Sequence, residues 1–97
     1  MYATVRRYEG ITDPAEVGRI IRERFVPLMT KIDGFVAYYW VDAGDGVMVA
    51  TTVFEDQAGV DSSNETATAF IRDEDLGNLY PNPAQVTVGE VVAAAAA

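Results

Sequence analysis

The sequence contains no cysteine and no histidine, and these two absences exclude much of the chemistry that proteins commonly use. Without cysteine there is no disulfide, no thiolate nucleophile and no thiolate metal ligand. Without histidine the chain lacks the usual general base, the usual haem ligand and the commonest zinc ligand. No nucleotide-binding glycine loop, GxSxG or HExxH pattern occurs either. We therefore expect no metal site and no cofactor.

Basic residues are also few, with 7 lysines and arginines against 15 acidic residues and a net charge of −8. This charge argues against nucleic acid and anionic membranes as partners. No apolar run approaches the length of a membrane span. The first residues, MYATVRRYEG, lack the basic and apolar regions of a signal peptide, so we expect a cytoplasmic protein. A length of 97 residues predicts one domain over residues 1–97.

The stretch GFVAYYWVDAGDGVMVATTVFE, residues 34–55, has the composition of a β-hairpin. Residues 35–41 and 47–54 are rich in β-branched and aromatic side chains, and Asp45-Gly46 supplies the positive φ angles of a tight turn. Strict alternation would point Phe35 to one side of the first strand, and Tyr38 and Trp40 to the other. Both sides of the hairpin are apolar, so each side of the sheet must be covered.

Local signals place the remaining elements. Asp13 and Pro14 open a helix whose apolar stripe continues to Gly34, with a kink near Glu23 caused by Pro27. Asp56 caps a second helix, which we expect to reach about Leu79, before two prolines. The expected strands outside the hairpin are residues 2–9 and 85–92, and the expected flexible tail is the alanine run at 93–97.

The resulting order, βαββαβ, predicts an α+β fold of the ferredoxin-like kind. Right-handed crossovers give a four-stranded antiparallel sheet with both helices on one face. The opposite face remains apolar and would be an aggregation surface if it were exposed. We expect the same face of a second copy to cover it, giving a homodimer.

Several stretches of the chain resemble the antibiotic biosynthesis monooxygenase-like proteins: MYATVRRYEG, FVPLMTKIDGF, FVAYYWVDAGDGVMVATTVFED and QVTVGEVV. The resemblance covers nearly the whole chain and implies a dimeric α+β barrel. It also implies a ligand pocket in each subunit, between the helices and the sheet. The superfamily includes cofactor-independent oxygenases of phenols and quinols, isomerases, cyclases and proteins without known function. Its haem-degrading branch uses a histidine, which this chain lacks.

The aromatic pair Tyr38 and Trp40 is one candidate for binding a planar ligand. The alternative is that both side chains belong to the core or to a dimer interface. Tyr39, between them, must face the other way.

Arg6, Arg7 and Asn64 are the polar candidates. Arg6 and Arg7 lie on opposite faces of a strand expected to be central, and an inward arginine could bind a carboxylate or phenolate. A salt bridge or a rim position is the alternative for both arginines. Asn64 shares a helix face with Val60 and could orient a ligand oxygen or bond a backbone carbonyl. No residue is assigned a catalytic role.

The leading hypothesis is a cofactor-independent monooxygenase acting on a small phenolic or quinol-like molecule. Such a site needs a base or an anion stabiliser, and Arg6, Tyr38 and Asn64 are the available groups. The alternative is a non-catalytic dimeric barrel that binds a small aromatic ligand or serves as an accessory protein, which the missing histidine favours. An isomerase or cyclase is a third reading, since it needs only a positioned acid–base pair.

Overall fold

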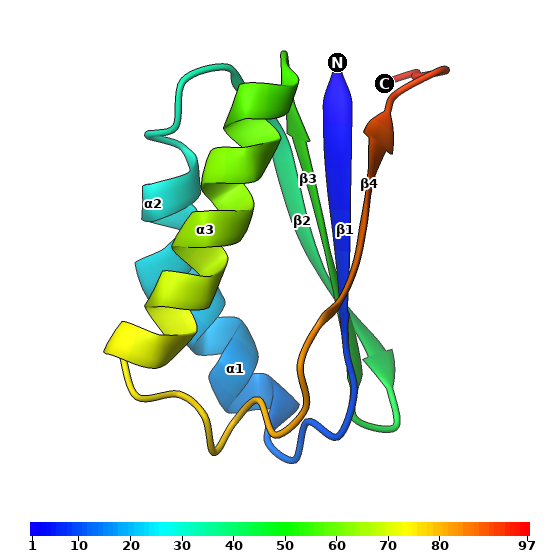
Figure 1. Ribbon diagram of the computed structural model, residues 1–97. Helices are drawn as coiled ribbons and strands as arrows, with labels where there is room; N and C mark the ends of the chain where they lie inside the picture. The colour runs from blue at the N-terminus through cyan, green and yellow to red at the C-terminus, as the bar shows by residue number, and fades with distance from the viewer.

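Residues 1–97 form two layers in the computed structural model, with a sheet on one side and helices on the other (Figure 1). The four strands pair antiparallel in the order β2-β3-β1-β4. The predicted ferredoxin-like fold is therefore confirmed, with β1 in the interior of the sheet. The elements are β1 (Tyr2–Tyr8), α1 (Pro14–Ile20), a π-helical turn η1 (Ile21–Phe25), α2 (Val26–Met29), β2 (Phe35–Gly44), β3 (Val47–Phe54), α3 (Gln57–Asp73) and β4 (Gln85–Glu90).

The hairpin turn uses the predicted Asp-Gly pair. Asp45 and Gly46 both have positive φ, 54° and 77°, as a two-residue hairpin turn requires. The strand before the turn reaches Gly44, three residues beyond the predicted end at Val41. An irregularity in the pairing between Asp42 and Gly44 allows this extension.

A bulge at the start of β2 changes the predicted faces of that strand. Phe35 pairs with Phe54 and Ala37 pairs with Val53, so β2 has one extra residue between these two pairs. Phe35 therefore turns to the helix side, where its ring packs edge-on at 5.9 Å from that of Phe54. The prediction that Phe35 and Tyr38 lie on opposite faces is wrong, because the extra residue resets the alternation.

The first helical segment begins and is interrupted where the sequence predicts. The Asp13 carboxylate accepts the Glu16 N–H at 3.2 Å, which confirms the cap. A π-helical turn containing Glu23 then separates α1 from α2. Pro27 has no N–H to donate to the previous turn, and the wider turn accommodates this loss. The turn buries Ile21 and Phe25.

The second long helix, α3, begins as predicted but ends earlier. Asp56 accepts the Gly59 N–H at 3.0 Å and caps the start. The helix ends at Asp73 rather than near Leu79, because Asp75 takes a positive φ of 55°. Leu76 then donates its N–H to the Ile71 carbonyl at 3.0 Å, which completes a Schellman motif without glycine.

The last strand is shorter than predicted and lies at an edge. It ends at Glu90 instead of Val92, and all its residues are exposed. The Val91 N–H still reaches the Met1 carbonyl at 2.8 Å, beside the N-terminal end of β1. No helix combines the length and the apolar character needed to cross a membrane.

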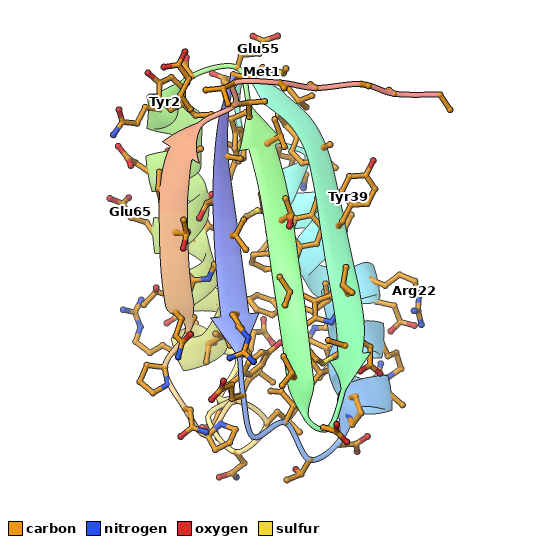
Figure 2. The ribbon with its side chains drawn as sticks, turned by 90° about the vertical axis from the view of Figure 1, so that its right-hand side faces the viewer. Met1, Tyr2, Arg22, Tyr39, Glu55 and Glu65 are labelled. Atoms are coloured by element: carbon orange, nitrogen blue, oxygen red, sulfur yellow. The ribbon has the colours of Figure 1, made fainter.

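The sheet face opposite the helices is not covered by any other element of the chain. Figure 2 views this face directly, with the helices behind the strands and the C-terminal residues crossing one end. Tyr39 projects from β2 here and is 64% exposed. The neighbouring side chains on this face are mostly small and apolar, and they include Ala3, Val5, Ala37, Val41, Val49 and Val53.

Candidate functional site

A narrow cavity lies between the helices and the sheet. Its volume is about 20 Å³, which accommodates roughly one water molecule. Most of its wall is apolar, and the polar atoms come chiefly from the sheet. The lining residues are Thr4, Arg6, Tyr8, Ile21, Phe25, Met29, Tyr38, Trp40, Ala50, Thr52, Ser63, Ala67, Phe70, Ile71 and Tyr80.

Strand alternation brings the polar wall together. Thr4, Arg6 and Tyr8 lie two residues apart in β1, so all three face the helices. Tyr38 and Trp40 have the same spacing in β2. Because β3 separates these two strands, the two sets face the cavity from opposite sides of its floor.

Arg6 is held in position by two neutral partners. Its Nε donates to the Tyr8 hydroxyl at 2.9 Å, and a terminal nitrogen donates to Asn64 Oδ1 at 3.1 Å. Thr4 donates to the same amide oxygen at 3.2 Å. The guanidinium carbon lies 5.8 Å from the centre of the Tyr8 ring. None of these groups is a carboxylate, so the charge of Arg6 is not neutralised by its neighbours.

Two buried donors in the cavity wall have no hydrogen-bond partner, namely the Tyr38 hydroxyl and the Trp40 indole N–H. Such groups are costly to leave unpaired and are rare in protein interiors. Burial, with smaller contributions from the Tyr8 and Tyr80 hydroxyls, raises the pKa of Tyr38 although Arg6 lowers it. Tyr38 therefore keeps its proton at neutral pH and is available to donate a hydrogen bond.

Tyr8 and Tyr80 belong to the same site, and the sequence-based prediction did not include them. The Tyr8 ring lies 5.6 Å from Trp40 and 5.1 Å from Tyr80, so the three rings form a continuous wall. Burial also raises the pKa of Tyr80. Tyr8 follows Arg6 by two residues, and this alternation is a signal that identifies it. Tyr80 follows the end of α3, where no periodicity predicts its direction.

Two larger clefts adjoin the cavity. A cleft of about 500 Å³ lies between β4 and the residues after α3, and it shares Arg6, Tyr8, Ile71 and Tyr80 with the cavity. We call it the β4 cleft; its other lining residues are Thr68, Pro81, Asn82, Pro83, Ala84 and Val86.

The second, a groove of about 440 Å³, runs between α1 and β2. It shares Ile21, Tyr38 and Trp40 with the cavity. Asp42 borders this groove, but it is exposed and its carboxylate accepts the Gly44 N–H at 3.0 Å. The Tyr38 and Trp40 rings thus separate the groove from the cavity.

The structure brings three of the four predicted ligand-binding residues onto one cavity wall, namely Arg6, Tyr38 and Trp40. Asn64 is not on that wall and bonds side chains, Arg6 and Thr4, rather than a backbone carbonyl. Arg7 is on the opposite face of the sheet, where it forms an ion pair with Glu9. No group of three or more histidine, cysteine, aspartate or glutamate side chains is placed to hold a metal ion.

Comparison with solved structures gives several close matches over nearly the full chain. A protein of unknown function from Nitrosomonas europaea, NE2512, aligns with a TM-score of 0.79 and 20% identity, covering 99% of this chain and 93% of that one. A monooxygenase from the ActVA-Orf6 gene of Streptomyces coelicolor, in complex with nanaomycin D, aligns with a TM-score of 0.73 and 16% identity, covering 99% and 91%. The chain has the fold of these two proteins.

SnoaB, a cofactor-independent oxygenase from Streptomyces nogalater, extends the similarity. It aligns with a TM-score of 0.74 and 17% identity, covering 96% of this chain and 94% of that one. No protein-family model and no curated protein sequence matches the chain. The resemblance to the antibiotic biosynthesis monooxygenase-like proteins is therefore confirmed at the level of structure, and these identities establish the fold without the activity.

Proposed function

We propose that the protein is a cofactor-independent monooxygenase of a small phenolic or quinol-like molecule. The observation that carries this proposal is a set of three donors, unpaired or unneutralised, in a mostly apolar cavity: Arg6, Tyr38 and Trp40. The fold shared with a monooxygenase bound to nanaomycin D and with a cofactor-independent oxygenase adds support.

These donors suit a reaction in which the substrate itself reduces dioxygen. An electron-rich phenolate ring adds dioxygen at carbon to give a hydroperoxide, and loss of water leaves a quinone. One oxygen atom ends in the product and the other ends in water. All four electrons come from the substrate, which loses the hydrogen of the oxygenated carbon and its phenolic proton to that water. Arg6 and Tyr38 would hold the phenolate oxygen in a dry site, where charge-assisted hydrogen bonds are strongest.

A cavity of about 20 Å³ is too small for such a substrate, since ligand pockets are typically about 300–1,000 Å³. The site must therefore open when ligand binds. Displacing the Tyr80 ring would join the cavity to the β4 cleft, and displacing Trp40 would join it to the α1–β2 groove.

Oxygen consumption tests the proposal, with a panel of hydroxylated naphthalenes and anthrones that have or lack a carbonyl group conjugated with the hydroxyl. We expect uptake coupled to quinone formation, reduced roughly 10–1,000-fold by Arg6→Met or Tyr38→Phe. Arg7→Met is the matched control, because the adjacent arginine faces the other side of the sheet. If Arg6, Tyr38 and Asn64 can each be replaced without effect on turnover of a confirmed substrate, the assignment is wrong.

The alternative is a non-catalytic barrel that binds a small aromatic ligand or acts as an accessory protein. The near-filled cavity favours it. Native mass spectrometry of protein purified from its own host separates the two readings. A retained aromatic molecule that is converted in air supports the enzyme, whereas a retained molecule that remains unchanged supports the binding protein.

We also propose that the protein is a homodimer joined through the open sheet face. Val5, Val49 and Val53 lie on this face in the two interior strands, and nothing in the chain covers them. Removing such a surface from water contributes about 25 cal/mol per Å². A sheet-to-sheet pairing around a two-fold axis places one cavity on each outer side of the dimer.

A further inference from the structure

The cavity and the β4 cleft contain donors but no group that can take a proton. Their titratable residues are one arginine and three tyrosines: Arg6, Tyr8, Tyr38 and Tyr80. Neither space is lined by aspartate, glutamate, histidine or lysine. A substrate hydroxyl bound here would meet no general base of ordinary strength.

The tyrosines do not replace the missing base. Burial raises the pKa of Tyr38 and of Tyr80, so both remain protonated and act as donors near neutral pH. The Tyr8 oxygen accepts the Arg6 Nε–H at 2.9 Å, so one of its lone pairs is already engaged. Asn64 Oδ1 already accepts from Arg6 and Thr4.

Arg6 is distinct among the arginines of this chain in combining a half-buried position with only neutral partners. Arg7, Arg19, Arg24 and Arg72 all form ion pairs on the surface. Arg6 forms none, in a chain whose net charge is −8. A partly desolvated cation without a counter-ion favours an anionic ligand. Arg6 borders both the cavity and the β4 cleft, so a ligand in either space can reach it.

We infer that this site selects ligands that are already anions in solution: phenols or enols acidified by a conjugated carbonyl, which are vinylogous acids. The anionic oxygen binds Arg6, and the planar ring lies in the β4 cleft between Tyr80 and Val86. The proton leaves to solvent before binding, so the protein contributes stabilisation of the anion and not its formation. This inference rests on the ligand site of the proposed function and specifies which phenols it takes.

The β4 cleft has the size and the walls for such a ring. Its volume of about 500 Å³ falls within the range of ligand sites. Apart from Arg6 it contains no charged side chain. The apolar part of its lining comes from Tyr8, Ile71, Tyr80, Ala84 and Val86, next to two prolines.

Two isomers of equal size provide the test. Lawsone, 2-hydroxy-1,4-naphthoquinone, is a vinylogous acid and is ionised at pH 7. Juglone, 5-hydroxy-1,4-naphthoquinone, keeps its hydroxyl proton in a hydrogen bond to the adjacent carbonyl. The protein has no cysteine to react with either quinone. Calorimetric titration, with quenching of the single tryptophan, Trp40, as a second signal, gives both affinities.

We expect lawsone to bind at least roughly tenfold more tightly than juglone at pH 7. Its affinity should fall about tenfold per pH unit below its own pKa and stay level from there to about pH 9. Arg6→Met should remove the preference, while Arg7→Met keeps it and Arg6→Lys retains part of it. Circular dichroism of each variant checks that the fold is intact.

Any of four results would overturn the inference. Three concern the wild-type protein: equal binding of the isomers, tighter binding of juglone, or no binding of either. The fourth is a preference for lawsone that survives Arg6→Met in a folded variant. Because lawsone is a binding probe and not a reductant, these results do not depend on turnover. Lawsone binding without oxygen uptake from any phenol would reject the oxygenase and keep the anion site. Oxygen uptake without a preference for lawsone over juglone would reject the anion site and keep the oxygenase.

Discussion

Tyr38 is a residue at which stability and binding compete. Its hydroxyl is buried without a partner in the wall of the cavity. A group in this state lowers stability, and its retention is understandable if a ligand oxygen supplies the missing acceptor.

Replacing Tyr38 with phenylalanine removes the unpaired hydroxyl and keeps the ring, which packs 5.8 Å from Phe25. We expect the free energy of unfolding to rise by about 1 kcal/mol. Urea unfolding followed by circular dichroism measures the change. A loss of stability would show that the hydroxyl already has a partner, such as a water molecule in the cavity.

Because these tyrosines are buried, we also expect the free energy of unfolding to fall at alkaline pH. Burial raises the folded-state pKa of Tyr38 and Tyr80, whereas both titrate near pH 10 in the unfolded chain. The stabilisation is therefore complete below about pH 10 and is lost as the pH rises further, by up to about 1.4 kcal/mol per unit for each group. Urea unfolding between pH 8 and 11.5 should show this slope, and the double variant Tyr38→Phe/Tyr80→Phe should reduce it.

Two glycines in helices have different neighbours, so we expect replacement by alanine to change stability in opposite directions. A Cβ on Gly59, in α3, would lie 2.6 Å from the Phe54 ring. A Cβ on Gly18, in α1, would meet nothing within 4 Å. We expect Gly59→Ala to lower the free energy of unfolding by about 1–3 kcal/mol. Gly18→Ala should raise it by about 0.5–1 kcal/mol.

Thermal unfolding of both alanine variants measures the contrast. Each serves as the control for the other, since the chemical change is identical. A similar shift of the unfolding temperature in both variants would show that the close contact of Gly59 with Phe54 does not determine the effect of an added Cβ.

The end of α3 depends on an aspartate in a conformation that favours glycine. Asp75 has φ of 55°, and three acidic residues in a row meet the negative end of the helix dipole. We expect Asp75→Gly to stabilise the protein by about 1 kcal/mol, since glycine adopts this φ without strain. Asp73→Gly is the matched control, because it puts glycine at the last residue of the helix, where φ is negative, and should destabilise it. Equal effects in thermal unfolding would contradict the Schellman assignment.

The proposed dimer is joined through the sheet rather than through the helices. An aspartate in place of Val5, on the open face of interior strand β1, should convert the proposed dimer to a monomer. Burying an unpaired carboxylate in an apolar interface costs several kcal/mol. Sedimentation velocity measures the outcome, with circular dichroism as the test of folding.

Val88→Asp is the control for the open face. Val88 pairs with Thr4, so it lies on the helix side of edge strand β4, and it is already 43% exposed. This variant should remain a dimer. If Val5→Asp also remains a dimer, the open face is not the interface, and a monomeric wild-type protein would reject the dimer altogether.

Local signals in the sequence were enough for the order of elements, the caps at Asp13 and Asp56, and the turn at Asp45-Gly46. Each of these depends on residues within a few positions of one another. The apolar character of both sides of the hairpin was equally readable, because a strand has a period of two. The fold class follows from these alone, and so does the expectation that the second sheet face is covered.

Features that depend on contacts across the chain could not be obtained in this way. The bulge that turns Phe35 toward the helices depends on pairing with β3. The end of α3 depends on hydrogen bonds that form only when a non-glycine residue adopts a strained conformation. The contact of Arg6 with Asn64 spans 58 residues, and Tyr80 reaches Tyr8 from an irregular segment. Packing of distant segments created the donor-rich site, since no local pattern records which side chains meet in the interior.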